Sequence, residues 1–97
     1  MAVDLVIRNG RVVTPAGTIH GGVAIEGERI AHVGGDATLP AARRVIDAKG
    51  AYVIPGLIEP HAHLGLSSTK GATEMEKWRQ DFGTETEGAI HGGVTTV

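Results

Sequence analysis

The sequence predicts a small antiparallel β-sheet or sandwich over its first half, followed by a single βαβ unit. Two observations support this fold class. Short β-rich segments recur about every ten residues up to residue 52, separated by glycine, proline or polar turn residues. After residue 52 the chain has, in order, an apolar segment typical of a buried strand, a polar loop, a helical pattern and a β-branched strand.

Composition narrows the classes of function. Of 97 residues, 41% are hydrophobic and 21% charged, as in a soluble globular protein, and the formal net charge is -2. Apart from Arg43-Arg44, lysine and arginine are scattered singly and form no basic stripe, so we expect neither nucleic acid nor a membrane as partner. No apolar run approaches the ~20 residues of a membrane span and no leader is visible, so the expected location is the cytoplasm. Cysteine is absent, and any metal must therefore be bound through nitrogen and oxygen atoms.

Two hairpins are expected in the first half, each made of two β-rich segments around a turn. The four segments are 5–8, 11–14, 23–25 and 30–33. Asn9-Gly10 is expected to form the first turn, because both residues tolerate positive φ. The polar residues 26–29 are expected to form the second.

A link over residues 37–44, irregular or helical, and an extended segment at 45–47 are expected to follow. His20 and His32 are lone histidines in or beside the hairpins, and we assign them structural roles. Arg43-Arg44 is interpreted as a solvated pair, because adjacent residues on a strand point to opposite faces.

From Tyr52 to Ile58 the chain is almost continuously apolar around Pro55-Gly56, which predicts a strand buried on both faces, and this strand is expected to continue to His63. Residues 65–71 hold serine and threonine between glycines and are expected to form a loop over the site described below.

Residues 74–91 are expected to be helical, in one or two pieces that end at two glycines, Gly92 and Gly93. Two segments, 73–76 and 84–87, match the capping box, in which a threonine and a glutamate three residues later exchange hydrogen bonds. The expected buried stripe of the helix consists of Phe82, Ala89 and Ile90. Met75 and Trp78, three residues apart, are also assigned to packing, with a substrate contact by Trp78 as the alternative.

Residues 94–97 are β-branched and predict a final strand. One crossover helix cannot bury a parallel pair of strands, whose open edges would lack neighbours. We therefore expect the sequence to be part of a longer chain.

The candidate functional site is the histidine pair His61 and His63. In a strand both imidazoles would project to one side, about 7 Å apart, and could turn onto one metal ion about 2.1 Å from each nitrogen. Glu59 shares that side and would orient them. Such pairs also occur by chance on surface strands, but Pro55-Gly56 and Pro60 restrict the backbone around this one.

Residues 55–63, PGLIEPHAH, and 88–97, GAIHGGVTTV, resemble the start of an amidohydrolase-superfamily enzyme of the cyclic-amidase branch. That branch contains hydantoinases, dihydropyrimidinases, allantoinases and dihydroorotases. The resemblance extends over essentially all 97 residues. It implies that residues 1–52 are the N-terminal portion of a β-sandwich. It also implies that residues 53–97 are the truncated start of a (β/α)₈ barrel of the TIM type, with the histidines at the C-terminal end of its first strand.

In that family the two histidines bind one of two divalent ions, commonly zinc, and later segments supply the other ligands and a catalytic aspartate. The resemblance therefore assigns His61 and His63 as metal ligands and no catalytic residue within this chain. Glu59 stands where the family usually has aspartate. Dihydroorotases place an arginine two residues after the second histidine, and Gly65 at that position favours a hydantoinase-like or dihydropyrimidinase-like relative.

The expected function is hydrolysis of the C–N bond of small cyclic amides, by a complete enzyme that is a homo-oligomer. This chain alone is expected to be inactive, because a barrel of this type needs about 250 residues. One alternative is a dihydroorotase, an allantoinase or another amidohydrolase such as a deaminase or deacylase. The other is a non-catalytic small β module that binds a partner or a metal weakly.

Overall fold

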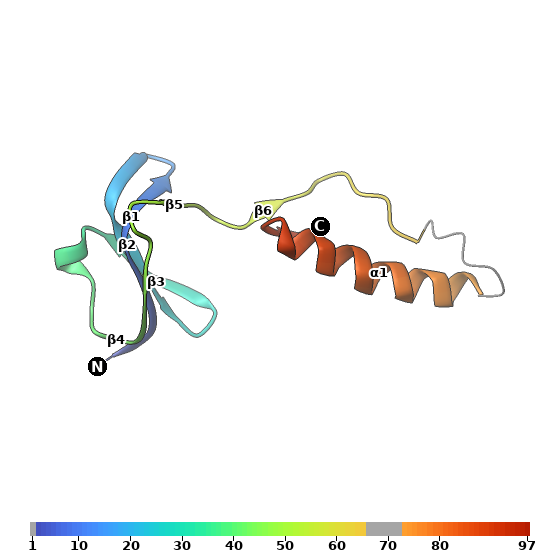
Figure 1. The fold of residues 1–97 in the computed structure, drawn as a ribbon, viewed down its shortest axis with the longest axis horizontal. Coiled ribbons are helices and arrows are strands. Elements are labelled where there is room, and N and C mark those ends of the chain that lie inside the picture. Colours follow the sequence, from blue (N-terminus) through green and yellow to red (C-terminus); the bar gives the residue numbers. More distant parts are fainter. Residues whose placement is uncertain (1, 66–72) are drawn as a thin grey trace. The chain divides into compact units, whose positions relative to one another are not determined.

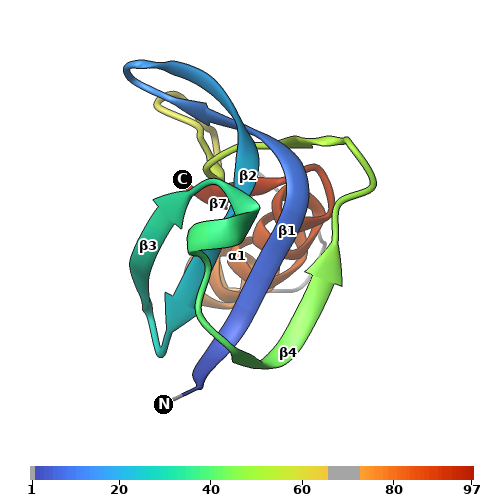
Figure 2. The same ribbon diagram turned by 90° about the vertical axis from the view of Figure 1, so that its left-hand side faces the viewer.

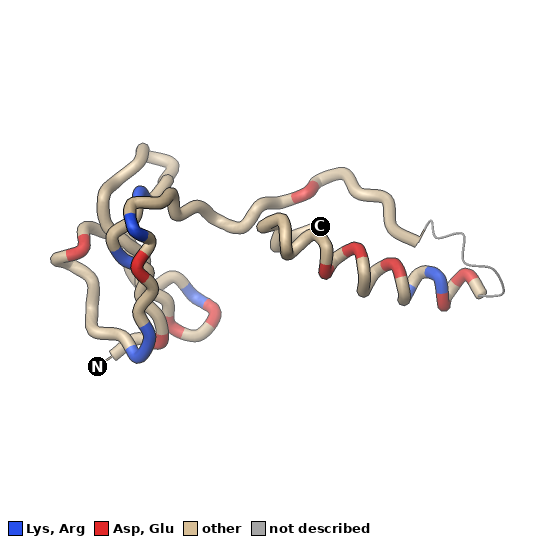
Figure 3. Tube along the Cα trace, in the orientation of Figure 1, with Lys and Arg blue, Asp and Glu red and all other residues tan. Residues whose placement is uncertain are grey.

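The computed structural model describes residues 2–65 and 73–97. The chain forms two compact units, Met1–Pro55 and Gly56–Val97 (Figure 1). Apart from Gly65, the loop expected at 65–71 lies outside the described residues. In the described part of the chain, no helix has the length and apolar content needed to cross a bilayer. Charged residues of both signs occur in each unit (Figure 3).

The first unit is a five-stranded sheet in the order β3-β2-β1-β4, with β5 also pairing to β1 (Figure 2). Its strands are β1 (Val3–Thr14), β2 (Gly17–Glu26), β3 (Arg29–Gly34), β4 (Ala42–Asp47) and β5 (Tyr52–Val53). The pairs β1/β2 and β2/β3 are antiparallel, and the predicted hairpin at residues 26–29 is confirmed. However, β4 and β5 run parallel to β1, so the expectation of a purely antiparallel sheet is wrong. The link after β3, which contains the short helix η1 (Asp36–Thr38), crosses to the far edge of the sheet before β4 begins.

The hairpin expected at Asn9-Gly10 is also wrong. β1 continues through both residues, and its register with β2 shifts between Ile7 and Gly10, as in a β-bulge. Asn9 does adopt a positive φ, 54°. Its backbone amide donates to Asp36 Oδ1 at 3.0 Å and its side-chain amide to Asp47 Oδ1 at 2.9 Å. The first hairpin turns instead at residues 15–16.

Polar contacts complete the first unit around a small core of Val6, Val12, Val23 and Ala24. His32 Nε2 lies 2.8 Å from Thr38 Oγ1, which confirms a structural role for this histidine. Arg43, interpreted as solvated, forms an ion pair with Asp4 of β1 at 2.9 Å while remaining largely exposed. The backbone amide of Lys49 and the side chain of Asn9 lower the pKa of Asp47 from its ordinary value.

The second unit contains β6 (Leu57–Ile58), α1 (Glu74–His91) and β7 (Val94–Thr96). β6 and β7 pair in parallel, Leu57 with Val94 and Ile58 with Thr96, so the predicted strand–helix–strand order is confirmed. Such a unit occurs in many α/β folds, and the start of a (β/α)₈ barrel stays a prediction.

The single buried strand expected from Tyr52 to His63 is wrong. β5 pairs with β1 of the first unit, whereas β6 pairs with β7, and Pro55-Gly56 lies between them. The boundary between the two compact units consequently lies after Pro55 in the chain. Leu57 and Ile58 are exposed, because within the described residues β6 has β7 alone as a strand neighbour.

A capping box starts α1, as predicted. Thr73 Oγ1 accepts a hydrogen bond from Glu76 N at 3.2 Å, and Glu76 Oε2 accepts one from Thr73 N at 2.7 Å. The bond from the Thr73 amide, and next the Thr73 side chain, lower the pKa of the Glu76 carboxyl from its ordinary value. The second capping box, expected at residues 84–87, is wrong, because the helix continues through it and Thr84 Oγ1 donates to the Gln80 carbonyl at 3.1 Å.

The helix ends at His91, with Gly92 as C-cap and Gly93 at a φ of 85°, as expected. The buried stripe is wrong: Phe82 is 49% and Ile90 55% exposed, and α1 has no buried residue. Helical spacing identifies side chains that share a face, but burial needs a partner surface, and the short β6 and β7 cover little of α1.

Candidate metal centre

His61 and His63 lie on the irregular segment that follows β6, rather than on the strand that the sequence predicted. Their Nε2 atoms are nevertheless 3.0 Å apart. The ring centroids are separated by 5.0 Å and the ring planes are inclined by 42°. The two imidazoles therefore present the same kind of nitrogen to one point in space.

This spacing fits two ligands of one metal ion. Two nitrogens 3.0 Å apart, each about 2.1 Å from an ion, subtend an angle of about 90° at that ion, and a tetrahedral angle needs about 3.4 Å. Small ring rotations would span that difference. Without an ion, a contact of 3.0 Å requires a proton on one Nε2, whereas ligation requires both Nε2 lone pairs and places both protons on Nδ1.

Two imidazoles make up half of a four-coordinate zinc site. Among residues 2–65 and 73–97 there is no cluster of three or more histidine, cysteine, aspartate or glutamate side chains suited to hold a metal. The histidine pair fits the ion in donor type and spacing, and a closed site needs further ligands from beyond the described residues.

Glu59 contacts the main chain of the histidine segment. Its Oε1 accepts a hydrogen bond from His61 N at 2.9 Å, and its own amide donates to the Thr96 carbonyl at 2.8 Å. The carboxylate thus fixes the turn into His61, and the backbone of Glu59 is tied to β7. The sequence predicted that Glu59 would orient the imidazoles. In the structure its carboxylate contacts the backbone amide of His61.

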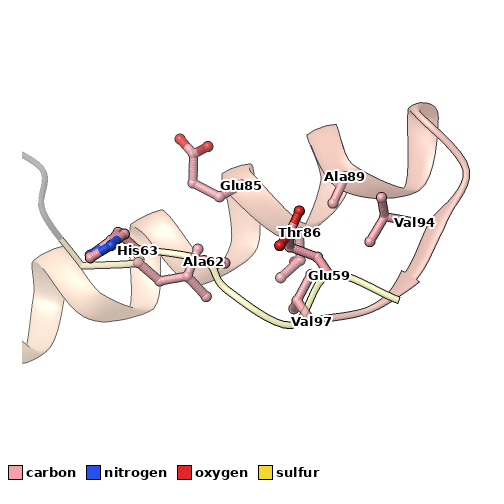
Figure 4. Close-up of a pocket in the computed structure, with 9 residues that line it drawn as sticks. Glu59, Ala62, His63, Glu85, Thr86, Ala89, Val94 and Val97 are labelled. Atoms are coloured by element: carbon pink, nitrogen blue, oxygen red, sulfur yellow. The ribbon is translucent and has the colours of Figure 1, made fainter. Parts of the chain in front are cut away.

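A cavity of about 200 Å³ lies within the second unit, with His63 at one end and Val94 at the other (Figure 4). Its lining residues are Glu59, Ala62, His63, Leu64, Glu85, Thr86, Ala89, Val94 and Val97. Sequence reasoning missed Glu85 and Thr86 of α1. Their spacing of four and three residues from Ala89, which was assigned to the inward face of the helix, would have identified them.

Relatives among known proteins cover nearly the whole of this chain. The chain is 35% identical over 96 residues to an allantoinase from Enterococcus faecalis. It is 37% identical over 94 residues to a D-hydantoinase from Rhizobium radiobacter and 39% over 92 residues to a dihydroorotase from Lactobacillus helveticus. These matches cover 99%, 97% and 95% of this chain. The chain spans only 19–20% of the length of these relatives.

Solved structures give the same result, although no protein-family model matches the chain. An L-hydantoinase (dihydropyrimidinase) from Arthrobacter aurescens aligns with a TM-score of 0.58 and 27% identity, over 68% of this chain and 15% of that one. A D-hydantoinase from a Bacillus species aligns with a TM-score of 0.57 and 44% identity, over 72% and 15%. Sequence relatives that cover nearly the whole chain, and the shared fold, show that the chain belongs to the cyclic-amidase branch of the amidohydrolase superfamily.

Proposed function

We propose that this chain supplies two metal ligands, His61 and His63, to a hydrolase that opens the C–N bond of small cyclic amides. The observation that carries the proposal is the separation of 3.0 Å between the two Nε2 atoms, in a chain related to allantoinases, hydantoinases and dihydroorotases. Two imidazoles at this distance on an irregular segment suit shared ligation better than two independent surface roles.

In this proposal His61 and His63 hold one divalent ion, zinc, through their Nε2 atoms. When bound, the ion supplies Lewis-acid polarisation of the scissile amide carbonyl and lowers the pKa of the attacking water. Glu59 holds the backbone of His61 in the conformation that presents its ring. The second ion of a binuclear centre, its ligands and the group that moves the proton belong to the complete enzyme, which we propose to be a cytoplasmic homo-oligomer. This chain alone is then inactive.

Our choice among the cyclic amide substrates depends on Gly65. This position follows His63 by two residues and has no side chain with which to bind a substrate carboxylate. An uncharged ring, such as a hydantoin or a dihydropyrimidine, therefore fits better than dihydroorotate. Allantoinase remains the second candidate, because allantoinases are among the relatives of this chain.

The proposal can be tested by activity assays and zinc analysis of the purified native gene product that carries this sequence. The gene product is assayed with hydantoin, dihydrouracil, allantoin and dihydroorotate, and its zinc content is measured. We expect hydrolysis of hydantoin or dihydrouracil, and loss of both activity and bound zinc in His61→Ala and in His63→Ala. His20→Ala, an exposed histidine of β2, is the matched control and should change neither quantity. Full activity and full zinc content in both site variants would refute the proposal.

The non-catalytic alternative makes a different prediction for the 97-residue chain alone. Two imidazoles leave zinc without enough ligands, so the enzyme proposal predicts weak zinc binding by this chain. Tight zinc binding that is lost in His61→Ala and in His63→Ala, without hydrolysis in the native gene product, would favour a metal-binding module.

A further inference from the structure

The histidine segment is irregular, so its geometry depends on what restrains it at each end. Before the pair, the Glu59 carboxylate accepts the hydrogen bond from His61 N. After the pair, Gly65 adopts a left-handed φ of 75°. A Cβ atom built on Gly65 would lie 2.8 Å from Nε1 and 2.9 Å from Cδ1 of Trp78. The indole of α1 therefore lies directly against the main chain two residues after His63.

Trp78 is itself held in place. It stacks on Phe82, one helical turn later, with ring centroids 6.4 Å apart and planes inclined by 19°. The hydrogen bonds of the capping box fix the start of the same helix one turn before Trp78. The Trp78 side chain is 50% exposed, so burial alone does not account for its position. A large aromatic ring has few torsions to restrict, and it makes a rigid support for a neighbouring turn.

We propose that Trp78 is a positioning residue for the metal centre. By supporting Gly65 it holds the turn that presents His63 to the same point as His61. This inference rests on the proposed function, since it concerns the same histidine pair. A pair that is already at ligand distance binds an ion more tightly than a pair that must be ordered on binding, because the ordering entropy is not lost at that step.

Zinc affinity of the native gene product, measured by competition with a chromogenic chelator, tests this role. Trp78→Ala should weaken zinc binding about tenfold, the effect typical of groups that orient metal ligands. Trp78→Phe keeps a flat ring beside Gly65 and should restore most of the affinity. Met75→Ala, an exposed apolar residue one turn earlier on α1, is the matched control and should leave the affinity unchanged.

A double-mutant cycle separates the contact from general helix stability. Gly65→Ala alone should weaken zinc binding, because its Cβ would overlap the indole and its φ is unfavourable for alanine. In the double variant Gly65→Ala/Trp78→Ala the overlap is removed, so the combined loss should be smaller than the product of the two single losses. A combined loss of zinc affinity equal to the product of the two single losses would mean that the residues act independently and would overturn the inference. Should Trp78→Ala not fold, the zinc affinity of Trp78→Phe decides the question.

Cobalt(II) in place of zinc adds a readout of ligand geometry. The visible absorption bands of the cobalt form should change in Trp78→Ala and return in Trp78→Phe. Wild-type affinity and an unchanged cobalt spectrum in Trp78→Ala would overturn the inference and leave the proposed function standing. Failure of the wild-type protein to bind either metal would overturn both.

Discussion

Removal of the Glu59 carboxylate tests the restraint before the histidine pair. Glu59 Oε1 accepts one hydrogen bond, at 2.9 Å from His61 N, at an exposed position. A hydrogen bond to a charged group contributes about 1.5–3 kcal/mol, and exposure to solvent reduces this to about 1 kcal/mol. If that contribution is lost from the metal-bound form, Glu59→Ala should lower zinc affinity about fivefold.

Two further variants separate the hydrogen bond from the charge. Glu59→Gln keeps an acceptor oxygen at the same reach and should retain most of the affinity. Glu59→Asp keeps the charge on a side chain one methylene shorter and should lie between wild type and Glu59→Ala. The assay is chelator competition on the native gene product at fixed pH and ionic strength. Wild-type affinity in Glu59→Ala would refute the reasoning, and a Glu59→Gln as weak as Glu59→Ala would assign the effect to charge.

Three further predictions concern stability. Thr73→Ala should cost about 1 kcal/mol of α1 stability in circular-dichroism melting, whereas Thr84→Ala, inside the helix, should cost clearly less. Because hydrogen bonds lower the pKa of Glu76, its stabilising contribution is complete above its ordinary pKa of about 4.3 and is lost as pH falls through the lowered value. Glu76→Gln should remove this part of the pH dependence of helicity, and an unchanged acid transition would contradict the assignment. Gly22→Ala should lower the free energy of unfolding in urea by about 1–3 kcal/mol, because its Cβ would overlap a main-chain carbonyl of β1, whereas Gly35→Ala, with open space, should not.

Features that depend on a few neighbouring residues followed from the sequence. The capping box at Thr73 joins residues three positions apart, and the glycines after His91 end the helix locally. The second capping box failed because the same four-residue pattern also fits inside a continuing helix, where the Thr84 hydroxyl finds the Gln80 carbonyl. Pattern alone does not say whether a helix has already begun.

Features that depend on residues far apart in the chain could not be predicted from the sequence. Asn9-Gly10 has the composition of a hairpin turn, yet Asn9 bonds to Asp36 and Asp47, which lie 27 and 38 positions further along the chain. These bonds keep the positive φ inside a continuous strand as a bulge. The parallel placement of β4 and β5 beside β1 similarly depends on where the link after β3 leads the chain.

The identity of the functional groups could be predicted from residue types and motifs: two imidazoles two residues apart, bordered by proline, in a chain with the motifs of the cyclic amidases. The arrangement of these groups in space became known only from the folded chain. The 3.0 Å approach of the Nε2 atoms, the bond from His61 N to Glu59 and the support of Gly65 by Trp78 were not visible in the pattern. The physical reason is that residue types are local, whereas the position of an irregular segment depends on backbone torsions and on the helix and strand that pack beside it.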